Sequence, residues 1–214
     1  MKIGQSIINR VHVVKYLGVH LDDKLTWTAH TKYVTDRLIK IASTIKIIKH
    51  FIPERCKKQI YYAHVYSRIM YGIEAYGYTA SNNINQVQVM QNRILKSLYN
   101  RDWYTNSNIL HKDLQLLQVK DIFHQSILKL VYKQLNGKLP EIFSDYFNNR
   151  KYFHNINTRN SNKLNIIQPR TNYGTRTLRF MGSKLYNSLP ESIYNSGSLN
   201  IFSKQLHRYF LERL

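Results

Sequence analysis

The sequence predicts a mainly α protein with a short N-terminal β-hairpin, a helical bundle and a helical C-terminal extension. Residues 11–22 are rich in β-branched and aromatic side chains, which favour strands. From residue 29 onward apolar residues recur at helical spacing. The chain has 214 residues, of which 43% are hydrophobic, enough for a core. We expect four segments: a hairpin at 1–28, a helical bundle at 29–147, a basic Asn-rich linker at 148–181 and a C-terminal helical segment at 182–214.

The run at 11–22 predicts a short, largely buried strand that ends at the polar turn Asp22–Asp23–Lys24. Residues 2–6 are predicted to form a turn before this strand, so that the N-terminal segment is expected to be a β-hairpin. Two strands alone are marginal in water, so we expect the hairpin to pack on helices or on a further sheet. Gly18 lies inside the strand, where a residue without Cβ indicates a bulge, a close backbone approach or a packing glycine.

The first helix is predicted between Ala29 and Ile52, and its pattern is the most regular in the chain. Its apolar residues form one continuous stripe: Val34, Leu38, Ile41, Ile45, Ile48 and Ile52. At about 100° per residue, the face away from this stripe carries Lys32, Lys40, Lys46 and His50, and Arg37 and Lys49 flank the stripe. This basic face is either available to bind anions or simply solvated.

Further helices are predicted up to residue 147. Pro53 and Glu54 suit a helix start, because the missing N–H of proline is tolerated there and an acid favours a helix N-terminus. Between residues 55 and 76 apolar side chains occupy two faces, which predicts a central helix of the bundle. Its tyrosines are interpreted as core. The remaining helices are expected at 84–98, with Arg93 and Lys96, at 107–117, at 122–135, with a C-cap at Asn136–Gly137, and at 139–147.

The composition changes near Asn148. Residues 148–168 are rich in Asn and poor in apolar side chains, which predicts a loop or a weakly ordered linker. Between Lys151 and Phe180 there are six basic residues and no acid. This run is interleaved with aromatic side chains and is either a binding segment or a solvated tail. After Gly182 we expect a short helix, a break at 189–191 and a final helix with Leu199, Phe202, Leu206 and Phe210.

Charge is the strongest global signal of the sequence. It contains 32 Lys and Arg against 12 Asp and Glu, which gives a net charge of +20 and a pI of about 10.0. Such a charge attracts polyanions, and nucleic acid is the commonest of these. With this partner in view, Tyr16 and Gly18 are interpreted as a strand edge near a nucleic-acid backbone. The basic run after residue 150 is interpreted as phosphate contacts plus base stacking.

Other classes of protein are disfavoured by what the sequence lacks. The single cysteine, Cys56, excludes an internal disulfide and a multi-cysteine zinc site. No run is long and apolar enough for a membrane span, and Met1–Gly4 does not resemble a signal peptide. We therefore expect an intracellular protein, in the nucleus or the cytoplasm, that has no membrane partner.

No catalytic constellation is present in the sequence. There is no Gly-rich phosphate loop, no nucleophile elbow and no His pair at i, i+4 for zinc. Asp22–Asp23 is the one acidic pair, and paired carboxylates can hold a divalent metal for phosphoryl transfer if a further acid joins them. No such acid is marked, so we interpret the pair as the turn that ends the strand.

In order along the chain, several short runs resemble the reverse transcriptases of non-LTR, LINE-type, jockey-like retrotransposons. The set spans nearly the whole chain, and it is specific as an ordered series rather than in any single piece. The matching residues are Val14–Asp22, Leu25–Trp27, His30, Tyr71–Ile73, Leu139–Pro140, Thr158–Arg159, Gly182–Pro190 and Phe202.

The resemblance covers the family's region from the end of the palm through the thumb to the C-terminus. It implies a primer-grip strand, thumb helices that clamp an RNA–DNA duplex by its backbone, and a C-terminal extension. Tyr76 and Tyr186 stand where the family often has tryptophan. The palm motif of an aromatic residue, Ala, Asp and Asp has no counterpart here, so no catalytic residue is carried over. Mg²⁺ is expected only for that missing palm, and this chain is expected to hold no cofactor.

Three functional hypotheses follow. The leading one is a truncated retroelement product that binds RNA, DNA or an RNA–DNA duplex without sequence preference and has no polymerase activity alone. The second is a working part of an RNA-directed DNA polymerase whose palm lies upstream or on another polypeptide. The third is a helical interaction module that docks an acidic protein. The residues expected to contact nucleic acid are Tyr16, Gly18, Lys32, Lys40, Lys46, Lys49, Arg93, Lys96, Arg159, Lys163, Arg170, Arg176 and Arg179.

Overall fold

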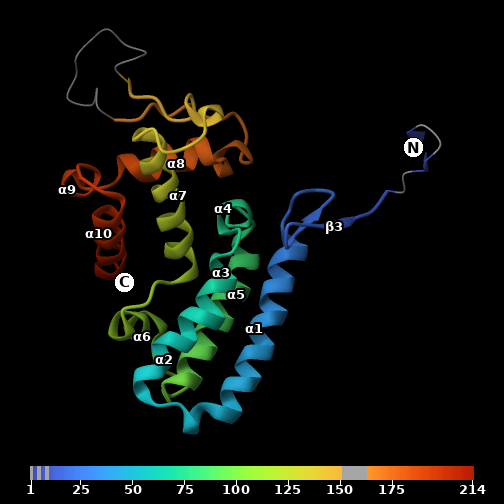
Figure 1. Ribbon diagram of the computed structural model, residues 1–214, viewed down its shortest axis with the longest axis vertical. Helices are drawn as coiled ribbons and strands as arrows, with labels where there is room; N and C mark the ends of the chain where they lie inside the picture. The colour runs from blue at the N-terminus through green and yellow to red at the C-terminus, as the bar shows by residue number, and fades with distance from the viewer. Residues whose placement is uncertain (1, 4–5, 8–9, 151–162) are drawn as a thin grey trace. The chain divides into compact units, whose positions relative to one another are not determined.

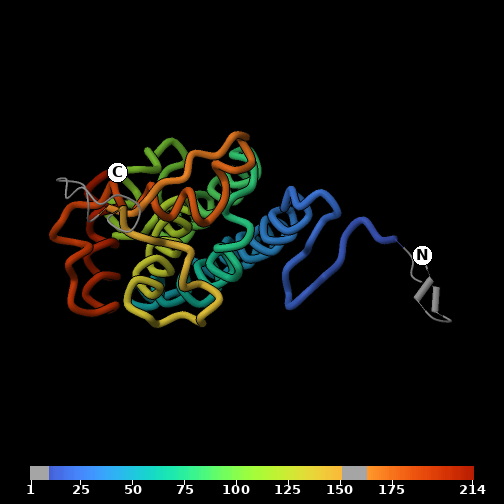
Figure 2. The backbone as a smooth tube through the Cα atoms, turned by 90° about the horizontal axis from the view of Figure 1, so that it is seen from above, coloured from blue at the N-terminus to red at the C-terminus, as the bar shows by residue number. Residues whose placement is uncertain are grey.

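The computed structural model describes residues 2–3, 6–7, 10–150 and 163–214, and it confirms a mainly α fold (Figure 1). The chain divides into two units, Met1–Ser107 and Asn108–Leu214. Figure 2 shows the same course of the chain from a second direction. The division falls inside the predicted bundle at 29–147, and the four segments defined by composition stay predictions.

The predicted strand at 11–22 is a hairpin of its own. Strand β3 (Val13–Tyr16) pairs antiparallel with β4 (Val19–Asp22), and Tyr16 lies opposite Val19. Leu17 and Gly18 form the two-residue turn with φ values of 45° and 80°, as in the type I′ turns that match strand twist. The single-strand prediction is therefore wrong. Further upstream, β1 (Lys2–Ile3) pairs with β2 (Ser6–Ile7).

The prediction that this strand is largely buried is also wrong. The side chains of β3 are exposed, whereas β4 is half-buried and packs against α1 (Thr28–Ile48). The turn folds the chain back on itself, so that only one strand of the pair reaches the helix. Within the described residues β3 pairs with β4 alone, and its other edge has no strand beside it.

The helices of the first unit follow the predicted order. The stripe of α1 is buried at Val34, Leu38 and Ile45. The start of helix α1 lies beside the start of α5, where the side-chain amide of Asn83 donates to the hydroxyl of Thr28 at 3.1 Å. After α1 the elements are the 3-10 turn η1 (Lys49–Phe51), α2 (Glu54–Ile60), the π-helix η2 (Tyr61–Tyr66), α3 (Ser67–Met70), α4 (Ile73–Tyr76) and α5 (Ser81–Leu98).

The segment 55–76 corrects the prediction of a helix with two apolar faces. Four of its fully buried side chains recur every fourth residue, at Tyr61, Val65, Ile69 and Ile73, and Tyr76 is fully buried as well, whereas Tyr62 is exposed. A π-helix has more residues per turn than an α-helix, so residues four apart stay on one face. The helix then breaks at Gly72, which has a φ of 69°.

The second unit is built around α7 (Val119–Leu135), which packs against α8 (Leu178–Asn187) and α10 (Leu199–Glu212). The predicted C-cap is confirmed, because Gly137 follows α7 with a φ of 64°. The helix predicted at 139–147 is only a 3-10 turn. The other elements are α6 (Ser107–Leu114), η3 (Glu141–Phe143), η5 (Gly174–Arg176) and α9 (Glu191–Tyr194).

One end of the Asn-rich segment belongs to the core of this second unit. Leu164 is fully buried with Val131 and Phe147. The side-chain amide of Asn187 accepts from the Leu164 N–H at 2.8 Å and donates to its carbonyl at 2.9 Å. Such a pair of bonds gives an irregular backbone segment the partners that a strand would provide. At this end, the segment is a loop, as one of the two predicted alternatives has it, and its packing is fixed rather than weakly ordered.

Candidate functional site

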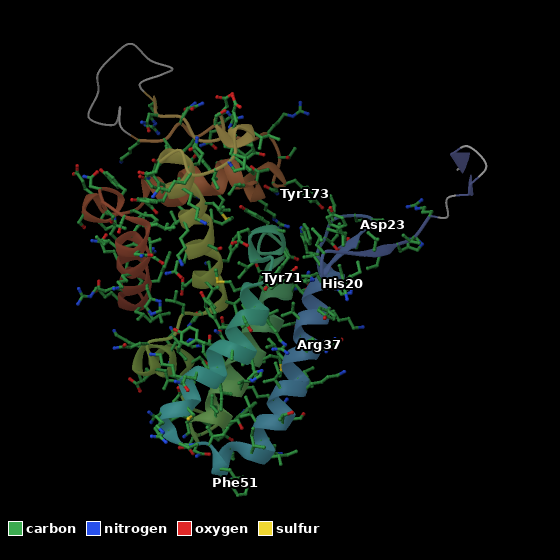
Figure 3. The ribbon with its side chains drawn as sticks, in the orientation of Figure 1. His20, Asp23, Arg37, Phe51, Tyr71 and Tyr173 are labelled. Atoms are coloured by element: carbon green, nitrogen blue, oxygen red, sulfur yellow. The ribbon has the colours of Figure 1, made fainter. Side chains whose placement is uncertain are left out.

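The basic face of α1 is exposed as the sequence predicts. Lys32, Lys40 and Lys46 are solvent-exposed, and Lys49 is half-buried in η1. Phe51, at the corner that follows, is also strongly exposed (Figure 3). This edge of the first unit therefore presents cations beside an aromatic ring. That these residues contact nucleic acid stays a prediction.

Two of the predicted residues come together in a hollow between α1 and α5. Lys46 from α1 and Arg93 from α5 line a cavity of about 550 Å³, whose walls include Ile39, Ile47 and Met90. Lys96, one turn further along α5, is directed to the next loop, where its Nζ donates to the carbonyl of Trp103 at 2.6 Å. The structure thus joins Lys46 with Arg93 and gives Lys96 a local role.

The loop after α5 carries two aromatic residues that the sequence reasoning missed. Trp103 is 64% exposed and Tyr104 is 95% exposed. The ammonium group of Lys96 lies 5.7 Å from the centre of the Trp103 ring. Exposed aromatic rings held beside cations are the elements of a stacking platform. The sequence signal that could have identified them is the Arg101–Tyr104 run directly after the helix. The periodic apolar pattern of the helix has ended there, so it does not predict burial of these aromatic side chains.

A second cavity, of about 480 Å³, lies between the β3–β4 turn and helices α1 and α3. Figure 3 labels Tyr71, His20 and Arg37 in this part of the first unit. The hydroxyl of Tyr71 donates to the Leu17 carbonyl, and a Cβ built on Gly18 would lie 3.2 Å from the Tyr71 ring. Gly18 is thus a turn residue with a close side-chain neighbour rather than a bulge. Tyr16, on β3, is 63% exposed.

The acidic pair, Asp22 and Asp23, accepts hydrogen bonds from residues next to the β3–β4 hairpin. The carboxylate of Asp22 accepts from the backbone N–H groups of Thr26 and Trp27 at 2.8 and 2.7 Å. Burial raises the pKa of Asp22, but the hydrogen bonds from Thr26 and Trp27 outweigh it and the net pKa is lowered. Hydrogen bonds from His12 and then Arg10 lower the pKa of Asp23. The pair therefore anchors the turn before α1, as interpreted from the sequence.

The second unit holds the remaining basic residues. Lys163, Arg170, Arg176 and Arg179 are all exposed, and Arg159 lies outside the described residues. The guanidinium of Arg176 lies 6.0 Å from the ring centre of the exposed Tyr173, whereas Arg179 donates to the Asp145 carbonyl at 3.2 Å. The predicted cations thus form two groups, one in each unit.

In the described part of the chain, no cluster of three or more His, Cys, Asp and Glu side chains is placed to hold a metal ion. Nor does any described helix combine the length and apolar character that a membrane crossing requires.

These features define a mainly α, strongly basic chain with exposed aromatic side chains, and the chain is similar in sequence to RNA-directed DNA polymerases of jockey-like non-LTR retrotransposons. It is 31% identical over 118 residues to a probable RNA-directed DNA polymerase from transposon BS of Drosophila melanogaster. It is 26% identical over 139 residues to the RNA-directed DNA polymerase from mobile element jockey of the same organism. A probable polymerase from transposon X-element, also of Drosophila melanogaster, is 27% identical over 127 residues.

These matches confirm the resemblance predicted from the sequence. They cover 54%, 64% and 56% of this chain, but only 13%, 15% and 13% of the length of the three relatives. No protein-family model matches the chain, and no solved structure does.

Proposed function

We propose that this chain serves as a nucleic-acid-binding part of an RNA-directed DNA polymerase and holds RNA, DNA or an RNA–DNA duplex by its backbone. The observation that carries the proposal is the hollow that both Lys46 of α1 and Arg93 of α5 line. Two residues 47 positions apart in sequence are brought to one concave, solvent-facing place. The similarity to RNA-directed DNA polymerases supports the same function.

The physical basis of binding is counterion release. Each Lys or Arg that neutralises a phosphate frees a condensed cation, so affinity depends steeply on salt and little on sequence. The exposed lysines of α1 and Arg93 supply this contact in the first unit. Trp103 and Tyr104 add faces on which unpaired bases can stack. The proposed mode of binding is therefore sequence-tolerant.

The salt dependence of binding tests this proposal. If about six phosphates are contacted, log affinity falls against log salt concentration with a slope near −5. The measurement is fluorescence anisotropy of a labelled RNA–DNA duplex titrated with the full chain at several salt concentrations. A flat salt response would contradict the proposal.

A matched pair of variants locates the contact. The triple variant Lys40→Gln, Lys46→Gln, Arg93→Gln should reduce the slope by about 2 to 3, since each lost phosphate contact removes about 0.9. The control variant Lys138→Gln, Lys204→Gln, Arg208→Gln removes the same charge from exposed positions of the second unit. An equal loss in both variants would show that only the net charge matters and that the α1–α5 face is not the contact.

Polymerase activity by this chain alone is not part of the proposal. Asp22 and Asp23 are engaged in the hairpin, and no further acid joins them in a metal cluster among the described residues. We therefore expect no primer extension on an RNA template with Mg²⁺. Extension by the purified chain would contradict this, whereas extension only after a palm-containing polypeptide is added would support a working part of a polymerase.

A further inference from the structure

The cavity beside the β3–β4 turn is lined by hydrogen-bond donors, and the charged side chains among its described lining residues are positive. Eight residues line it: Gly18, His30, Tyr33, Val34, Arg37, Ser67, Arg68 and Tyr71. Two of these described lining residues are arginines, and none of them is acidic. A cavity of this size falls in the range of small-ligand sites, roughly 300–1,000 Å³. The donors in its wall therefore set the chemistry of what it accepts.

His30 gives the most specific information about that chemistry. Its side chain is 1% exposed, and burial followed by repulsion from His20 lowers its pKa to about 4, so the ring is neutral at pH 7. The backbone N–H of His20 donates to Nδ1 of His30 at 3.3 Å. In a neutral imidazole with Nδ1 as acceptor, the proton sits on Nε2. His30 therefore presents an N–H donor at Nε2.

This Nε2–H is buried and has no hydrogen-bond partner among the residues that the structure describes. A buried donor without an acceptor costs about 1–3 kcal/mol, so such groups are rare unless a ligand or water completes them. His30, which carries this unmet group, is one of the residues that line the cavity together with Arg37 and Arg68.

The two arginines come from different helices. The guanidinium of Arg37, from α1, lies 5.2 Å from the centre of the Tyr33 ring. Arg68, from α3, uses Nη1 to donate to the His64 carbonyl at 2.9 Å. A guanidinium carries five N–H donors in a planar fork, so both groups keep donors for an anion. Arginine in this setting suits phosphate, whose oxygens accept several bonds at once.

We propose that this cavity binds one phosphate group, held by Arg37 and Arg68 and accepting a hydrogen bond from Nε2–H of His30. Tyr33 and Tyr71 line the cavity beside it and suit contact with the attached sugar or base. The proposal deepens the proposed function by naming one built phosphate site apart from the α1–α5 face. The phosphate is either a terminal monoester or an internal diester of a nucleic-acid strand.

Binding is measured by proton–nitrogen NMR of the histidine rings in the full chain. Three probes are titrated: inorganic phosphate, a short oligonucleotide with a 5′-phosphate, and the same oligonucleotide without it. We expect the Nε2–H signal of His30 to shift and to exchange more slowly with water as phosphate is added. A stronger effect of the 5′-phosphorylated probe identifies the monoester, and equal effects of the two oligonucleotides identify the diester.

Charge-matched variants separate this site from general attraction. Arg37→Gln and Arg68→Gln should each weaken the His30 response at least tenfold. Arg55→Gln removes one exposed charge from α2 of the same unit and should change it less than twofold. His30→Phe keeps an aromatic ring and removes the donor, and thermal melting of all four variants checks that each is folded.

The outcomes also separate this inference from the proposed function. If phosphate leaves the His30 signals unchanged, or if all three arginine variants weaken the response equally, the phosphate site is wrong. Salt-dependent duplex binding through α1 and α5 can then still hold. Conversely, a His30 response to inorganic phosphate without any salt-dependent duplex binding would support the site and contradict the proposed function.

Discussion

His30 in the first unit and His111 in the second are two almost completely buried histidines with opposite hydrogen-bond partners. Their side chains are 1% and 0% exposed. Burial lowers the pKa of both rings; for His111 a hydrogen bond with Leu116 opposes the shift in part. In His30, Nδ1 accepts from a backbone N–H, whereas in His111 Nδ1 lies 2.9 Å from the Leu116 carbonyl and must be the donor.

The comparison shows how a backbone partner selects the tautomer of a buried histidine. In His111 the proton on Nδ1 satisfies a carbonyl in the turn between α6 and α7, which is a structural role. In His30 the proton is instead on Nε2, and His30 is one of the residues that line a cavity with two arginines. Equal burial therefore yields a structural hydrogen bond in one unit and an unmet donor in the other.

Replacing each histidine by phenylalanine tests this contrast and should give the largest effect. His111→Phe leaves the buried Leu116 carbonyl without its side-chain donor, which should lower the free energy of unfolding by about 2–3 kcal/mol. His30→Phe loses only a long 3.3 Å bond and also removes an unmet donor, so its cost should be about 1 kcal/mol or less. Urea unfolding followed by segment-resolved hydrogen exchange measures both values.

The location of the destabilisation is as informative as its size. His111→Phe should raise exchange in α6 and the first turns of α7, and His30→Phe in the hairpin and the start of α1. Equal costs for the two variants would show that His30 Nε2–H has an acceptor in solution and that the two histidines are equivalent.

The pH dependence of stability should differ in sign between His30 in the first unit and Asp121 in the second. His30 has a folded pKa of about 4, below the 6.5 of an unfolded histidine. Between these values the unfolded chain binds more protons, so stability is complete above pH 6.5 and is lost as the pH falls toward 4. The loss attributable to His30 is on the order of 3 kcal/mol, since one pKa unit corresponds to about 1.4 kcal/mol. His30→Phe should therefore flatten the dependence of unfolding free energy on pH.

Asp121 should act in the opposite direction in the second unit. Burial raises its pKa to about 6, against the partial effect of Lys120 and Arg213, so the folded state binds more protons between pH 6 and 3.8. Asp121 thus adds stability on acidification and offsets His124, whose pKa burial lowers to about 4. Asp121→Asn should steepen the acid loss that His30→Phe flattens. If both variants change the slope in the same direction, the assignment of these shifts is wrong.

The sequence predicted α1 and its exposed lysines well, because one apolar stripe on a long helix leaves a single arrangement that buries it. It failed at 55–76, because a π-helix changes the number of residues per turn and the tyrosines there mark several faces equally. It also missed the turn inside 11–22, since Leu17 adopts a positive φ that leucine rarely takes. The burial of Leu164 depends on Asn187, a long-range partner that local composition does not reveal.

The residues of the candidate sites also differ in whether the sequence could predict them. Exposed cations such as Lys40 and Arg93 were predictable, since charged side chains are exposed by default. The cavity was not, because Gly18, His30, Arg37 and Arg68 come from a turn and two helices that only the tertiary fold brings together. Neither the tautomer of His30 nor its missing partner has a sequence signal.

The last test compares one glycine from each unit. Gly18 and Gly137 both have positive φ, 80° and 64°, so alanine is strained at either position. A Cβ at Gly137 meets no atom of the described residues within 4 Å, whereas at Gly18 it lies 3.2 Å from the Tyr71 ring. Gly137→Ala should cost about 1 kcal/mol, and Gly18→Ala somewhat more, about 1–2 kcal/mol. Thermal unfolding with local hydrogen exchange measures each.

The difference between the two glycines is isolated by removing the neighbour. In a Tyr71→Ala background the close contact disappears, and Gly18→Ala should then cost as little as Gly137→Ala, since only the strain of the backbone remains. If the two costs are already equal with Tyr71 present, the tyrosine yields to the added methyl group. The turn would then require glycine for its backbone alone, and the wall of the cavity formed by Tyr71 would be adaptable rather than fixed.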